Sequence, residues 1–217
     1  MDDRNGLNGF RAVIFDFGGV LTESPLLSLR AFAEETGIGW ETLSPLFASH
    51  EGAWSRFETN ALSEAEFVVA FEQEARATGF RVDGWAFLKA FFGGMALRPE
   101  MLAVVRALRR QIKVGCITNN VQTSSTARRP AYEEIFDVVV ESSKVGLRKP
   151  NPGIYLIACE LLGVKPEAAI FLDDFGINLK AARALGITTI KVDETPFAVE
   201  ELERVLGVEL PRLEAGV

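Results

Sequence analysis

The sequence has little histidine and little cysteine, and each shortage excludes a class of site. Its 217 residues include one histidine, His50, and two cysteines, Cys116 and Cys159. A single histidine cannot build a histidine-based metal site. Two cysteines far apart in the chain give neither a disulfide framework nor a zinc-binding spacing. We expect both cysteines to be buried as apolar residues, in a reducing compartment.

The chain also lacks an excess of positive charge and any long apolar run. Its net charge is −7, whereas nucleic acids and anionic membranes attract clustered positive charge. No apolar run approaches the roughly 18 residues of a membrane-spanning helix, and the polar residues 1–6 have no signal-peptide core. We expect a cytoplasmic protein with no nucleic-acid or membrane partner, either a monomer or a homodimer. A small anionic substrate is compatible with this net charge, because nearby lysines or a bound cation outweigh the charge of the whole protein at the site.

Apolar residues make up 48% of the chain, enough for a full core. Five short apolar runs are typical of buried strands, and helical patterns separate the later ones. This alternation predicts an α/β fold with a doubly wound, Rossmann-like parallel sheet. The expected strands are 12–16, 114–118, 136–140, 169–173 and 188–192, and the expected helices are 99–110, 152–162, 178–185 and 198–206.

A helical segment interrupts this alternation after the first strand. It has no convincing strand pattern, and Ser63 with Glu66 matches a capping box at the start of one helix. We therefore predict an α/β core domain of residues 1–22 and 95–217 and a helical cap domain of residues 23–94. The cap is either a lid that covers the site and selects the substrate, or a fixed helical subdomain. Its expected helices are 26–35, 63–78 and 85–92, and its expected core residues include Trp40, Trp54 and Trp85.

The first expected strand ends in Asp16, which Phe17, Gly18 and Gly19 follow. Apolar residues leading into a carboxylate and two glycines indicate a buried parallel strand that stops at an exposed tip. Ligands of open α/β sheets bind beyond the carboxyl ends of the strands. Asp16 is therefore placed to be a nucleophile or a metal ligand. An aspartate that caps the next turn is the alternative.

Other expected strands end in polar residues that suit a phosphate and a cation. Thr118 and Asn119 offer hydrogen bonds to an anion after the second strand. Asp173 and Asp174 follow the fourth strand, and adjacent carboxylates need a cation or strong hydrogen bonds. Their oxygens suit Mg²⁺, which also binds substrate phosphate. Lys149, in a loop stiffened by two prolines, adds a positive charge.

These motifs, taken in order, resemble the haloacid dehalogenase superfamily of aspartate-nucleophile phosphatases. The resemblance covers most of the chain and rests on Phe15-Asp16 before Gly-Gly-Val-Leu, then Thr118-Asn119, Lys149-Pro150 and Asp173-Asp174. Residues 146–192 are similar to the branch that contains the N-terminal phosphatase domain of soluble epoxide hydrolase, with related sugar-phosphate phosphatases. The helical insertion matches the cap of that branch.

The resemblance implies Mg²⁺-dependent hydrolysis of a small phosphorylated metabolite through an aspartyl-phosphate. Asp174 would be the direct Mg²⁺ ligand, and Asp173 would support Lys149 or a metal-bound water. The implied catalytic residues are Asp16, Thr118 and Lys149, the implied substrate-binding residues are Asn119, Gly18 and Gly19, and the implied metal-binding residues are Asp16, Gly18 through its carbonyl, Asp173 and Asp174.

Gly18 departs from the family pattern, which usually has an aspartate there as general acid and base. Such catalysis contributes about 10² to 10⁴ in rate. The departure implies one of three things. The protein is a slow phosphatase, or it is specialised for substrates with good leaving groups, or water or a cap residue replaces the missing general acid. Two alternatives stay open. One is a catalytically weak phosphate-ligand-binding domain. The other is a 2-haloacid dehalogenase, whose carboxylate substrate the Asp173-Asp174 pair would repel.

Overall fold

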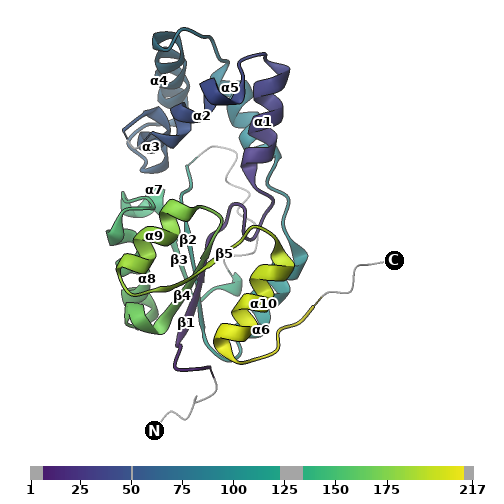
Figure 1. The fold of residues 1–217 in the computed structure, drawn as a ribbon. Coiled ribbons are helices and arrows are strands. Elements are labelled where there is room, and N and C mark those ends of the chain that lie inside the picture. Colours follow the sequence, from purple (N-terminus) through teal and green to yellow (C-terminus); the bar gives the residue numbers. More distant parts are fainter. Residues whose placement is uncertain (1–6, 50, 123–133, 213–217) are drawn as a thin grey trace.

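A computed structural model describes residues 7–49, 51–122 and 134–212 (Figure 1). Its sheet has five parallel strands in the order β3-β2-β1-β4-β5. The first strand therefore lies in the middle, between β2 and β4, and the polar carboxyl ends of these three strands meet at one edge. The strands are β1 (Ala12–Phe15), β2 (Lys113–Thr118), β3 (Val138–Glu141), β4 (Ala169–Asp173) and β5 (Thr188–Lys191).

Helices cover both faces of the sheet, which confirms the doubly wound α/β fold. Val13 and Phe15 of β1 pack in one hydrophobic cluster with α6 (Pro99–Leu108) and α10 (Thr195–Leu206). Ala12 and Ile14 pack in another with α8 (Pro152–Leu162) and α9 (Gly176–Ala184). Side chains alternate between the two faces of a strand, so β1 is buried on both. As expected, Cys116 and Cys159 are buried in these clusters.

The inserted helices lie beyond the carboxyl end of the sheet (Figure 1). They have a third hydrophobic cluster of their own, in which the ring centroids of Phe87 and Phe71 are 4.5 Å apart. The predicted capping box of Ser63 and Glu66 is confirmed. The division of the chain at residues 23 and 94 stays a prediction. These helices are α1 (Pro25–Glu35), α2 (Trp40–Ala48), α3 (Ala53–Glu58), α4 (Glu64–Ala77) and α5 (Gly84–Gly93).

The two segments that join these helices to the sheet run side by side. Thr22 and Leu97 form an antiparallel bridge. On either side of it, the Glu23 amide donates to the Ala96 carbonyl at 2.7 Å, and the Arg98 amide donates to the Leu21 carbonyl at 2.8 Å. The cap helices are therefore tied to the loop after β1 by paired backbone.

Several sequence predictions were wrong in detail. The third strand begins at Val138 rather than at residue 136, because the Asp137 carboxylate accepts from the Val114 amide at 2.9 Å and fixes the chain before the strand. Trp85 is not in a core, since 53% of it is exposed. Three short helices were not predicted individually, although two of them lie in the segment predicted to be helical. They are α2, which contains Pro45, α3 and α7 (Ser142–Val145). No helix of the described residues has the length and apolarity to cross a membrane.

Candidate active site

Asp16 follows β1 at the polar edge of the sheet, and its side chain is nearly buried. Its backbone amide donates to the Leu172 carbonyl of β4 at 2.8 Å, so the residue stays in register with the neighbouring strand. The Phe17 amide donates to Asp16 Oδ1 at 2.6 Å. These two bonds fix the carboxylate beside the end of β4.

Lys149 is buried, and its ammonium lies between two carboxylates. Its Nζ is 2.5 Å from Asp16 Oδ1 and 2.8 Å from Asp173 Oδ2. Asn119 holds the lysine backbone from both sides. The Lys149 amide donates to Asn119 Oδ1 at 2.8 Å, and Asn119 Nδ2 donates to the Lys149 carbonyl at 3.0 Å. The Asn119 side chain thus places the lysine loop, and its expected role in substrate binding stays a prediction.

Asp173 is fully buried, and both of its oxygens are engaged. The Phe175 amide donates to Oδ1 at 2.7 Å, Asn178 Nδ2 lies 3.1 Å from each oxygen, and Oδ2 accepts from Lys149. The Tyr155 hydroxyl donates to the Asn178 carbonyl at 3.0 Å and so holds α9 in place. Asp173 is therefore a fixed support for the lysine.

Asp174 differs from its neighbour, because its buried Oδ1 has no hydrogen-bond partner among the described residues. Gly19 leaves space for this carboxylate. The glycine has φ +79°, and a Cβ there would overlap Asp174 Oδ2. A Cβ at Gly18 would meet only Pro25 Cδ at 3.8 Å and Met95 Cε at 3.9 Å. Of these two glycines, Gly19 is therefore the one with a steric reason to be glycine.

Three carboxylates share this site with one ammonium. Oxygen atoms of Asp16, Asp173 and Asp174 all lie within 4.8 Å of one another. Burial raises the pKa of Asp16 well above its usual range, against the opposing charge of Lys149. Burial, with the charge of Asp173, raises the pKa of Asp174 to about 6.

Lys149 keeps its charge in this setting. Burial acts to lower its pKa, but the charges of Asp16 and Asp173 outweigh burial, so the pKa is raised. When all three carboxylates are ionised, the site has more negative than positive charge, which a bound cation would offset. An all-oxygen donor set with one unpartnered carboxylate oxygen fits Mg²⁺.

The remaining predicted residues also lie at this edge of the sheet. Thr118 is the buried last residue of β2, next to β1. Gly18 and Gly19 lie in the loop after Asp16. His50 lies outside the described residues.

Sequence reasoning missed two residues that shape the site. Asn178 is buried and binds Asp173. The available signal was an amide at the start of an expected helix, five residues after Asp173. Arg98 Nη1 donates to the Gly19 carbonyl at 2.9 Å, and Arg98 Nε lies 3.2 Å from Glu23 Oε1. Arg98 is 79 residues from Gly19 in the chain, so no local pattern could reveal its contact.

The comparisons with known proteins show the family. Residues 10–186 match the haloacid dehalogenase-like hydrolase family. The chain is 31% identical over 200 residues to phosphatase MT3486 from Mycobacterium tuberculosis, covering 85% of this chain and 88% of that protein. The chain belongs to the haloacid dehalogenase-like hydrolases.

Two longer relatives are also similar. Acyl-CoA dehydrogenase family member 10 from Mus musculus is 35% identical over 95% of this chain, which spans 20% of that protein. Bifunctional epoxide hydrolase 2 from Sus scrofa is 30% identical over 92% of this chain, which spans 39% of it. The chain therefore corresponds to well under half of these relatives.

Solved structures share the fold. A haloacid dehalogenase-family enzyme from Bacteroides thetaiotaomicron, in complex with magnesium and inorganic phosphate, has a TM-score of 0.63 and 23% identity over 84% of this chain and 93% of its own. A structure described as a dehalogenase has a TM-score of 0.64 and 21% identity over 96% of this chain and all of its own. Both kinds of enzyme thus have this architecture.

Replacing Gly19 tests whether the Asp174 carboxylate needs the space beside it. We expect Gly19→Ala to lower the free energy of unfolding by about 1–3 kcal/mol, because the new methyl group meets a carboxylate in a left-handed backbone conformation. Gly18→Ala is the matched control, and we expect little change or a gain of about 0.4–1 kcal/mol. Urea unfolding measures both. Equal effects of the two substitutions would contradict this account of Gly19.

Proposed function

We propose that this chain is a Mg²⁺-dependent phosphatase that hydrolyses a small phosphorylated metabolite through an aspartyl-phosphate. One observation carries the proposal. Asp16 lies against a buried lysine in a site where one buried oxygen of Asp174 has no hydrogen-bond partner within the described part of the chain. The similarity to phosphatase MT3486 supports it, as does the fold shared with an enzyme crystallised with magnesium and phosphate.

Asp16 would be the nucleophile. Its Oδ1 is held by Lys149 and the Phe17 amide, so we assign the attack on phosphorus to Oδ2. A bond forms between Oδ2 and phosphorus as the bond from phosphorus to the leaving oxygen breaks, and that oxygen takes a proton from water, because Gly18 has no acidic side chain. A second water then attacks phosphorus and gives its proton to solvent as the bond from Oδ2 to phosphorus breaks, which releases inorganic phosphate and restores the carboxylate.

The other residues would bind phosphate and hold the cation. Asp16, Asp174 and the Gly18 carbonyl would bind Mg²⁺, while Asp173 orients Lys149. When bound, the cation offsets the repulsion between the carboxylates and the phosphoryl group. Thr118 would donate a hydrogen bond to a phosphoryl oxygen, and the Lys149 ammonium would attract its charge. Substrate would enter between the sheet edge and the cap formed by residues 23–94.

Hydrolysis by the wild type and by Asp16→Asn tests the proposal. We expect phosphate release from p-nitrophenyl phosphate or phosphorylated metabolites in the presence of Mg²⁺, and none with EDTA. Asp16→Asn should lower kcat at least 10³-fold while circular dichroism stays unchanged, because an amide cannot replace the nucleophile. Release of halide from 2-haloacids without Mg²⁺ would instead support a dehalogenase, and no turnover at all would support a binding domain.

Gly18→Asp tests whether the rate is limited by a missing acid. The Cβ position at Gly18 has only ordinary contacts, so the structure has space for a side chain there. We expect the variant to raise kcat for alkyl phosphates, which need protonation of the leaving oxygen, about tenfold or more. Hydrolysis of p-nitrophenyl phosphate, a good leaving group, should change much less. An equal change for both substrates would contradict an acid role for this position.

A further inference from the structure

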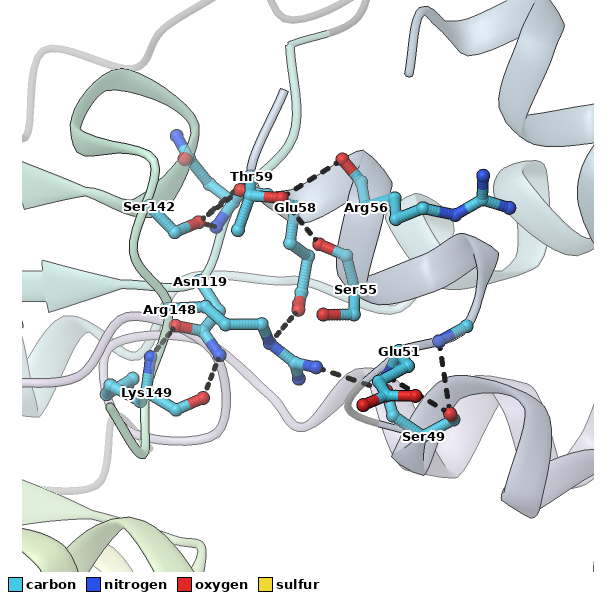
Figure 2. Close-up of polar contacts among 12 residues, drawn as sticks. Ser49, Glu51, Ser55, Arg56, Glu58, Thr59, Asn119, Ser142, Arg148 and Lys149 are labelled. Atoms are coloured by element: carbon cyan, nitrogen blue, oxygen red, sulfur yellow. Dashed lines mark hydrogen bonds and ion pairs between the residues drawn. The ribbon is translucent and has the colours of Figure 1, made fainter. Parts of the chain in front are cut away.

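A buried ion pair joins the cap helices to the loop of the catalytic lysine (Figure 2). Glu58, the last residue of α3, is only 4% exposed. Its Oε2 lies 2.7 Å from Nε of Arg148, which directly precedes Lys149. The Glu58 carboxylate thus contacts the residue next to Lys149, and the Lys149 ammonium contacts Asp16.

Two further contacts fasten the same part of the cap. Ser142 Oγ donates to the backbone carbonyl of Glu58 at 2.6 Å and accepts from the Asn120 amide at 3.0 Å. Arg148 Nη1 donates to the Ser49 carbonyl at 3.3 Å. The end of α3 therefore contacts the segment that follows β3 (Figure 2), and Ser142 links this contact to Asn120 in the segment that follows β2.

The geometry of the ion pair does not suit a purely stabilising role. Neither Glu58 Oε2 nor Arg148 Nε has an aligned hydrogen bond among the described residues, although the two atoms are close. Burial raises the pKa of Glu58 to about 7, and Arg148 only partly opposes this shift. Buried pairs of this kind often contribute little to stability compared with apolar residues.

We propose that Glu58 and Arg148 are positioning residues, which couple closure of the cap to the placement of Lys149 against Asp16. The coupling would pass from Glu58 to Arg148, and then along the backbone to Lys149, which Asn119 fixes from the β2 side. Closing the cap would thus complete the charge arrangement as it excludes water. The reaction step of this inference rests on the phosphatase function proposed above.

The test compares Glu58→Gln, Arg148→Gln and the double variant with a control on the same helix. Arg56→Gln is the control. The Arg56 side chain is 47% exposed, points away from Arg148 (Figure 2) and pairs with Glu74 of α4 at 3.7 Å. Two quantities are measured for each protein: hydrogen exchange of residues 53–58 and 142–149, and kcat and KM for p-nitrophenyl phosphate with Mg²⁺.

We expect faster exchange in both segments and a kcat at least tenfold lower in each single variant, with a smaller change in KM. A displacement of about 1 Å in a catalytic group can cost 10²-fold. The double variant should be no slower than the slower single variant, because both changes remove one contact. Arg56→Gln should stay within twofold of the wild type in kcat.

Other results would overturn the inference. Faster exchange with a kcat within twofold of the wild type would make the contact merely structural, and unchanged exchange would show that it does not hold the cap. If Glu58→Gln fails to fold, Arg148→Lys, which keeps the charge but shortens the contact, is judged by the same criteria. If the wild type hydrolyses no ester, the phosphatase proposal fails. Calorimetric binding of inorganic phosphate with Mg²⁺ then decides: at least tenfold weaker binding in Glu58→Gln supports the coupling, and equal binding refutes it.

Discussion

The contact of the Lys149 ammonium with Asp16 and Asp173 is the interaction on which the rest of the site depends. A lone buried ammonium would cost several kcal/mol, and here two carboxylates at 2.5 and 2.8 Å offset that cost. The strand order brings these groups together. Because β1 lies between β2 and β4, the chain can present Asp16, Asn119 and Asp173 at one edge from segments far apart in the sequence.

The same contact explains the features around it. Lys149 balances only part of the charge of three carboxylates, so the site favours a cation beside Asp174, whose Oδ1 has no other partner among the described residues. Asp173 accepts from the Lys149 ammonium, and Asn178 and the Phe175 amide hold its carboxylate in place. Two adjacent carboxylates in the sequence thus have different surroundings, which fits the different tasks proposed for them.

Local patterns predicted the sheet and the chemical groups at its edge, because short apolar runs and the polar residues that end them lie next to each other in the sequence. The individual helices α2 and α3 were not predicted within the helical insertion, since nine and six residues give little helical period and Pro45 interrupts the first. The supports of the site could not be predicted. Arg98 with Gly19 joins residues 79 apart, and Ser142 with Glu58 joins residues 84 apart, so only the folded chain reveals them.

The central claim is that Asp16 becomes phosphorylated during turnover, and trapping that intermediate tests it most directly. The wild type is mixed with Mg²⁺ and a phosphate ester that it has been shown to hydrolyse. The reaction is quenched in acid within one turnover and analysed by peptide mass spectrometry. The account predicts one phosphoryl group on the peptide that contains Asp16, lost on treatment with base or hydroxylamine. A phosphoryl group on another residue, or turnover with no modified peptide at any quench time, would contradict it.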